Sequence, residues 1–262
     1  MQKKIIIICS ILFLLVIFIC LFCIFTNKKV FFKVENRYSE IKQAKKHFKE
    51  DNIIGWIRVQ GTGIDYPILG YAEDYPVEEI GYAWIDNNDD KYHNVLNVYG
   101  HNLLNLGPFP SINDDEFYRF ESLMAFIYYD FAKENKYVQL TMDGKDYVYQ
   151  IFAAGIVRNY YVTILPKTEY NEEQKDFYLK VVKENTIYDY DVKVDNTDNF
   201  ITLVTCTRFY GSQYDSFYIA AKLVDNNEKS IYNNYNVSKN KKYKKVEKVL
   251  KGDVSNEKDD NS

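Results

Sequence analysis

Residues 52–69 read NIIGWIRVQGTGIDYPIL, and they indicate the fold class of the chain. Two short runs rich in β-branched and aromatic residues, 53–59 and 64–68, are separated by the turn cluster Gln60-Gly61-Thr62-Gly63. Runs of this kind bounded by glycine-containing turns are typical of strands. The stretch therefore predicts two short strands at the start of a mainly β domain.

The same pattern recurs along the chain after this opening. Further short β-rich runs occupy residues 82–85, 95–99, 137–142, 147–157, 200–205 and 217–224. Turn signals such as Asp143-Gly144 stand between neighbouring runs. We expect a barrel or sandwich of about eight strands.

Three segments show helical rather than strand spacing of their apolar residues. Residues 115–135 and 172–184 carry apolar side chains at helical steps, so we expect helical insertions that cover barrel edges or wall a groove. Residues 35–51 show the same steps of three and four among charged residues. This pattern predicts a short amphipathic helix that packs on the domain.

The N-terminus predicts a membrane anchor. Residues 5–25 contain only Ser10 as a clearly polar residue, and a helix of this length rises enough to cross a hydrocarbon layer of ~30 Å. No small-residue cleavage site follows, so we expect an uncleaved transmembrane helix. Residues 1–4 would precede it as a cytoplasmic N-terminus. Residues 26–51 would then form a stalk with the amphipathic helix. Lysines flank both ends of the span, so charge alone leaves its orientation open.

The rest of the chain reads as one domain, 52–225, and a polar tail. Residues 226–262 are rich in lysine and asparagine, and we expect this tail to be disordered, although 239–251 permits a frayed helix. The net charge of −4 gives no general case for nucleic-acid binding. Neither a phosphate-binding loop, a dinucleotide motif nor a Cys/His metal cluster occurs, so we expect no cofactor and no metal.

Cys206 is the only cysteine outside the apolar N-terminal run, and it closes the pentapeptide TLVTC at 202–206. A lone thiol is either a small buried hydrophobe or a nucleophile activated by a nearby base or positive charge. Of the three histidines, His47, His93 and His101, only His101 directly follows a strand and a glycine. That place suits a side chain held at a barrel rim. The residues alone leave both interpretations of the thiol open.

The sequence resembles a class B sortase from about residue 52 to residue 224. The matching pieces are 52–69 quoted above, VYGHNL at 98–103, PFPSINDDEFYRF at 108–120 and ITLVTC at 201–206. The helical segment 172–184 between the penultimate strands is what separates class B from shorter sortases. The order and spacing of these pieces, behind an anchor, make the resemblance specific.

The resemblance implies a membrane-anchored cysteine transpeptidase of a Gram-positive bacterium, with an eight-stranded β-barrel outside the cell. Such an enzyme cleaves a sorting signal of the NP-x-T type after threonine and passes the acyl group of a surface protein to a peptidoglycan amine. Cys206 would form the thioacyl intermediate, and His101 would act as general acid and then as base. Thr205 would support the oxyanion, while Thr202 and Leu203 would position the strand end.

One family feature is missing. Sortases carry an essential arginine on the strand after the cysteine, and an ungapped alignment places Ser216 there. Among the five arginines of the chain, Arg208 is the one close in sequence to Cys206. Our hypothesis is that Arg208 substitutes for the family arginine through its planar fork of donors. The alternative is that Arg208 is a solvated loop residue and that the enzyme is slow or inactive.

Two other functions stay open at this point. An L,D-transpeptidase-like enzyme would also place an arginine two residues after its cysteine, but it would show a Ser-x-Gly-Cys context where this chain has Leu203-Val204-Thr205. A membrane-tethered binding domain that has lost turnover is the other alternative, and the serine at position 216 is its main support.

Overall fold

The computed structural model describes residues 32–48, 52–70, 83–85, 94–103, 105–112, 120–159, 170–224 and 235–252. Residues Lys33–Ser262 form one compact unit. The expected anchor at 5–25 and the preceding 1–4 segment lie outside the described residues. No helix within the described ranges has the length and apolar character needed to span a bilayer.

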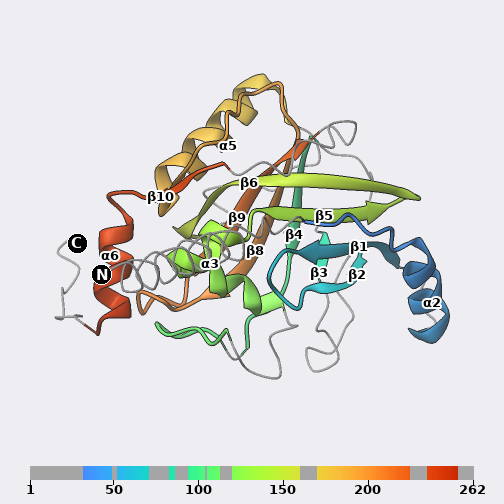
Figure 1. Ribbon diagram of the computed structural model, residues 1–262, viewed down its shortest axis with the longest axis horizontal. Helices are drawn as coiled ribbons and strands as arrows, with labels where there is room; N and C mark the ends of the chain where they lie inside the picture. The colour runs from blue at the N-terminus through green and yellow to red at the C-terminus, as the bar shows by residue number, and fades with distance from the viewer. Residues whose placement is uncertain are drawn as a thin grey trace, which may run out of the picture. The chain divides into compact units, whose positions relative to one another are not determined.

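Eight strands close into a barrel (Figure 1). They are β1 (Ile53–Val59), β2 (Asp65–Leu69), β3 (Ala83–Ile85), β4 (Val95–Tyr99), β5 (Tyr137–Met142), β6 (Lys145–Arg158), β8 (Phe200–Thr207) and β9 (Asp215–Val224). Their order around the barrel is β1-β2-β3-β4-β8-β9-β6-β5. The expected eight-stranded barrel is therefore confirmed, and each strand overlaps one of the predicted β-rich runs.

The register of β4, β8 and β9 sets the geometry of the functional site. β4 pairs with β8 in parallel, and β8 pairs with β9 in antiparallel orientation. Successive side chains of a strand point to opposite faces of the sheet. Leu203 and Thr205 take one face and Thr202 and Val204 the other, and all four are buried.

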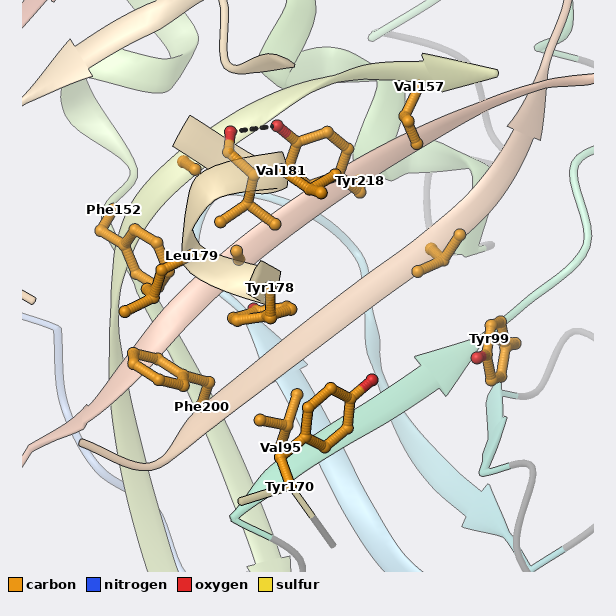
Figure 2. Close-up of a cluster of buried hydrophobic side chains, with 14 residues drawn as sticks. Val95, Tyr99, Phe152, Val157, Tyr170, Tyr178, Leu179, Val181, Phe200 and Tyr218 are labelled. Carbon is orange, nitrogen blue, oxygen red and sulfur yellow. Dashed lines mark hydrogen bonds between the residues drawn. The ribbon is translucent and has the colours of Figure 1, made fainter. Parts of the chain in front are cut away.

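Helix α5 (Glu172–Asn185) covers the face of the sheet that includes Thr202 and Val204. It begins with a capping box, in which the Asn171 side chain accepts from the Gln174 backbone N–H and the Gln174 side-chain oxygen accepts from the Asn171 backbone N–H. Figure 2 shows the α5 side chains Tyr178, Leu179 and Val181 among Phe152, Phe200 and Tyr218 of the strands. The predicted helix at 172–184 is confirmed.

The first helical insertion differs from the single helix expected at 115–135. Its described part is a 3₁₀ helix, η1 (Phe120–Ile127), followed by the short helix α3 (Tyr129–Glu134). Every residue of η1 is buried, including Glu121 and Ser122. A segment with no solvent face is shaped by the surrounding packing rather than by its own helical pattern, which explains the break into two pieces.

Helix α2 (Tyr38–Phe48) matches the expected amphipathic helix before the barrel. Ile41 and Ala44 pack against Ile53 of β1 and Leu69 of β2.

The C-terminal segment departs from the expectation of a disordered tail at 226–262. Residues 237–239 form strand β10 (Val237–Lys239), which pairs with β7 (Tyr188–Tyr190), and α6 (Tyr243–Leu250) follows. Tyr243, Val246 and Val249 of α6 are buried. The sparse apolar residues among the lysines fall on one helical face and pack against tyrosines of the domain. The expected disorder was therefore wrong for 235–252, whereas the helix that the sequence permits within 239–251 is present as α6.

Candidate active site

His101 and Cys206 are brought together at the ends of β4 and β8. Tyr99 pairs in parallel with Val204, and the Gly100 N–H continues the ladder by donating to the Val204 carbonyl at 3.2 Å. His101 and Cys206 each lie two residues beyond the paired residues Tyr99 and Val204. The register therefore places the backbones of His101 and Cys206 at the same edge of the barrel.

Two side-chain hydrogen bonds fasten these strand ends to each other. The Thr205 hydroxyl donates to the Gly100 carbonyl at 2.8 Å, and the Asn102 amide donates to the Cys206 carbonyl at 2.8 Å. Gly100 also has no room for a side chain, because a Cβ there would collide with the ring of Phe120. The backbone on either side of His101 is thus held against the backbone of Cys206.

The loop that follows His101 is closed by its own polar contacts. The Asn102 amide donates a second bond to the Asn105 carbonyl at 3.1 Å, and the Asn105 N–H donates to the Asn102 side-chain oxygen at 2.8 Å. The Leu103 N–H donates to the buried Glu121 carboxylate of η1 at 2.6 Å. Asn102 is 5 % exposed, so its amide acts as an internal brace.

Cys206 is exposed and is the only cysteine among the described residues. Protein atoms crowding the sulfur raise the pKa of the Cys206 thiol, because they remove water from around the thiolate. The positive charge of Arg208 acts in the opposite direction and lowers that pKa. The thiol is therefore accessible, and a guanidinium lies within electrostatic reach of it.

His101 is half-buried beside Trp84 of β3. The centroids of the two rings are 4.8 Å apart, with 47° between the ring planes. Burial lowers the pKa of the His101 imidazole below its usual value. Burial thus favours the uncharged form of both groups.

Arg208 follows directly on the last residue of β8. Its backbone N–H donates to the Leu106 carbonyl at 2.7 Å, and its carbonyl accepts from the Gly211 N–H at 2.8 Å in a turn. Gly211 has a φ of +89°, a conformation that glycine adopts without strain. Arg208 is thus exposed at the start of the β8–β9 turn, next to the loop that follows His101.

Ser216 lies directly opposite Cys206, on β9. The side chain at that position is partly buried. The nearby Arg158, at the end of β6, is instead ion-paired with Asp215, with 3.7 Å between Nε and Oδ1.

Thr202, Leu203 and Thr205 form the packed part of the strand that carries the thiol. The Thr202 and Tyr178 hydroxyl oxygens lie 2.8 Å apart, which joins β8 to α5. Leu203 is fully buried on the opposite face, beside the buried Thr205. The Thr205 hydroxyl is committed to Gly100 on the face away from the thiol, so its observed contact is a positioning contact.

Sequence reasoning missed two residues of the site. Asn102 follows the histidine directly, but its bond to the Cys206 carbonyl depends on the β4–β8 pairing. Trp84 stands on a predicted strand and reads as ordinary packing until β3 is placed beside β4, where Trp84 pairs with Tyr99. Among the described residues, no group of three or more His, Cys, Asp or Glu side chains is arranged to hold a metal ion.

Known proteins share the sequence family and the fold of this chain. The sortase domain family matches residues 57–224. Sortase B of Listeria monocytogenes is 27% identical over 200 residues, covering 71% of this chain and 74% of the relative. The solved structure of Clostridium perfringens sortase B is 25% identical, with a TM-score of 0.57, covering 70% of this chain and 99% of that one.

A solved complex of Staphylococcus aureus sortase B with substrate has the same fold, with a TM-score of 0.56 at 20% identity. It covers 73% of this chain and 88% of that chain. The family match spans most of the barrel and includes both strand ends that carry the imidazole and the thiol. The chain therefore belongs to the sortase family of cysteine transpeptidases, in its class B.

Proposed function

We propose that this protein cleaves a cell-wall sorting signal of the NP-x-T type after threonine and transfers the acyl group to an amine of peptidoglycan. The observation that carries the proposal is the placement of His101 and Cys206 at adjoining strand ends, with the thiol exposed. The substrate complex of the Staphylococcus aureus relative supports a substrate bound at this fold.

The first half-reaction forms a thioester on Cys206. The thiolate attacks the threonine carbonyl carbon, a carbon–sulfur bond forms, and the carbonyl π electrons move to oxygen. As the tetrahedral intermediate collapses, the carbon–nitrogen bond breaks and the His101 imidazolium gives its proton to the departing nitrogen. The thioacyl enzyme and a free amine are the products.

The second half-reaction returns the enzyme to its starting state. The acceptor amine attacks the thioester carbon, and the neutral His101 imidazole takes the proton that the amine nitrogen loses. The carbon–sulfur bond then breaks and Cys206 leaves as the thiolate. The acyl group ends on the acceptor as an amide, and the imidazolium and thiolate are both restored.

Burial disfavours the reactive thiolate–imidazolium ion pair. Burial raises the pKa of Cys206 and lowers the pKa of His101, and both shifts favour the uncharged pair. Any group that stabilises the thiolate therefore increases the reactive fraction directly.

Arg208 is the group that we assign to this role in place of the family arginine. Its charge lowers the pKa of Cys206, and its guanidinium can donate to the oxyanion that develops on the threonine carbonyl. Ser216, opposite the thiol, carries no charge. Arg208 thus supplies from the β8–β9 turn what the family supplies from the following strand.

The proposed reaction requires an extracytoplasmic domain. The apolar segment 5–25 would anchor the chain as a single-pass membrane protein, with the barrel on the side of the cell wall. Protease protection of intact cells, with an epitope placed after residue 252, tests this orientation.

The reaction is tested with a fluorogenic NP-x-T peptide and an amine acceptor, with mass spectrometry of Cys206. We expect cleavage after threonine and a mass increase on Cys206 equal to the acyl fragment. Cys206→Ala and His101→Ala should abolish turnover. Cleavage of cross-linked muropeptides alone would instead indicate an L,D-transpeptidase-like enzyme, and peptide binding without an adduct would indicate a binding domain.

The role of Arg208 has a matched control in Arg158. Both arginines are exposed, Arg208 directly after β8 and Arg158 at the end of β6, the two strands that flank β9, but Arg158 is paired with Asp215. We expect Arg208→Ala to lower kcat/KM by about 10²-fold, the size of the loss when one oxyanion donor is removed. Arg158→Ala should change it by less than about threefold, as rim charges usually do. Unchanged turnover of Arg208→Ala would refute the substitution of the family arginine.

A further inference from the structure

The C-terminal segment 235–252 lies beyond the matched sortase domain, yet it is built into the same unit. Strand β10 pairs with β7 through Val237–Tyr190, Ser238–Asp189 and Lys239–Tyr188. In Figure 1, the chain passes from β10 into α6 beside the barrel. The segment adds an element of fixed position next to the sortase barrel.

Aromatic packing holds α6 in place. The ring of Tyr243 lies 5.4 Å from that of Tyr188 and 6.4 Å from that of Tyr129, measured between centroids. The Tyr188 hydroxyl donates to the Ile127 carbonyl at 2.7 Å, which ties this cluster to η1. Val246 is fully buried on the same side of α6. The helix therefore has a rigid base.

From this base, α6 reaches the β8–β9 turn that begins with Arg208. The Lys245 ammonium lies 4.5 Å from the centroid of the Tyr210 ring. Tyr210 in turn contacts the ring of Phe209, with centroids 5.1 Å apart, and Phe209 is 2 % exposed. A cation and the face of a tyrosine ring attract each other, so Lys245 holds Tyr210 and with it the turn.

Lys245 also acts on the far side of the same turn. Burial raises the pKa of Asp215, the first residue of β9, and the charges of Arg158 and Lys245 act against that shift. Asp215 is ion-paired with Arg158. The turn from Arg208 to Asp215 is thus restrained by Lys245 at Tyr210, while the Arg208 N–H is fixed to Leu106 at its start.

We infer that Lys245 is a positioning residue for Arg208, and that the C-terminal segment serves to hold the guanidinium beside the Cys206 thiol. This inference rests on the proposed role of Arg208. The C-terminal segment, which lies beyond the sortase domain, thereby supports an arginine that stands on a turn and not on a strand. A turn residue needs an external support that a strand residue receives from the sheet.

The test measures the rate at which iodoacetamide alkylates Cys206 in the full chain at neutral pH, together with kcat/KM for the peptide. We expect Lys245→Ala to lower both by about two- to fivefold, the range that one exposed cation–π contact accounts for. Lys244→Ala, an exposed neighbour on the same helix, should change neither. Lys245→Arg should restore both, because an arginine makes the same contact with the ring.

The double variant separates this inference from the role of Arg208. If Lys245 acts through Arg208, Lys245→Ala has no further effect in an Arg208→Ala background. An equal loss in both backgrounds would overturn the inference. A damaging Arg208→Ala with a silent Lys245→Ala would overturn it as well, while leaving the proposed function intact. If Arg208→Ala is itself silent, the proposed role of Arg208 fails first.

A change of fold is excluded by a second pair of variants on the turn. Tyr210→Phe keeps the ring under Lys245 and should retain the alkylation rate, whereas Tyr210→Leu should show the loss seen for Lys245→Ala. Equal rates for the two Tyr210 variants, with unchanged thermal melting, would contradict the inference.

Discussion

Cys206 on β8 lies directly opposite Ser216 on β9, and Ser216 in turn pairs with Val157 on β6. Directly paired residues of an antiparallel ladder share one face of the sheet, with Cβ atoms ~4.5–5.5 Å apart. The small hydroxymethyl group therefore occupies the place from which a longer side chain would reach the thiol.

Restoring an arginine at this position should rescue the loss of Arg208. Ser216→Arg in an Arg208→Ala background is expected to recover at least about tenfold in kcat/KM, because the guanidinium donates to the oxyanion from the neighbouring strand. The measurement is peptide turnover with an amine acceptor. Ser216→Lys is the control, since it supplies a charge without the planar fork, and it should recover less. A folded Ser216→Arg variant without any recovery would refute this geometry.

Trp84 should control the acidic limb of the pH profile. Burial lowers the pKa of His101, so Trp84→Ala, which admits water to the imidazole, should raise that pKa toward its usual value. Because His101 loses its proton at lower pH than Cys206, the acidic limb of kcat/KM should move to higher pH. Titration of the His101 ring protons by NMR measures the same change. Trp56→Ala, at an exposed bond to Asp65, should leave the limb in place.

Asn102 should affect kcat more than KM. Asn102→Ala removes the bond to the Cys206 carbonyl and the brace of the following loop, so the imidazole and thiol lose their fixed separation. A displacement of about 1 Å costs up to ~10²-fold in rate, so we expect kcat to fall by about ten- to a hundredfold while KM changes less. Asn105→Ala is the control, because Asn105 contacts Asn102 only through its backbone. Similar losses in both variants would mean that the loop matters rather than the bond.

Tyr178→Phe should reduce stability without changing the chemistry. The Tyr178 and Thr202 hydroxyls form a buried pair, and its loss should lower the free energy of unfolding by about 1 kcal/mol. Urea unfolding followed by tryptophan fluorescence measures the change. Phe177→Leu, at a neighbouring position that is 53 % exposed, should be close to neutral. A Tyr178→Phe variant as stable as the parent would show that the hydroxyl pair makes no net contribution.

The barrel was predictable from the sequence because its strands carry local signals. Each of the eight runs has β-rich composition and a turn beside it, and these signals need no knowledge of the partner strand. The strand β10 and helix α6 lack such independence. Their few apolar residues stand among lysines, and only the tyrosines at positions 129 and 188 make that face a buried one.

The candidate site was predictable only in part for a related reason. Cys206 and His101 could be selected because each stands in a recognisable local context at a strand end. Trp84 and Asn102 have no distinctive neighbours, and their roles follow from which strands pair. The position of Arg208 also depends on where β8 ends, and the sequence leaves that end open by one or two residues.

The parallel seam between β4 and β8 joins Gly100 and Thr205, which are 105 residues apart in the chain. Contacts of such long sequence separation form slowly, because the entropy of closing the intervening loop is lost before they stabilise the fold. Before these contacts form, the chain therefore carries a thiol that has no imidazole near it. The proposed acyl transfer would begin only when this seam closes, so recovery of turnover during refolding would time the closure of the barrel itself.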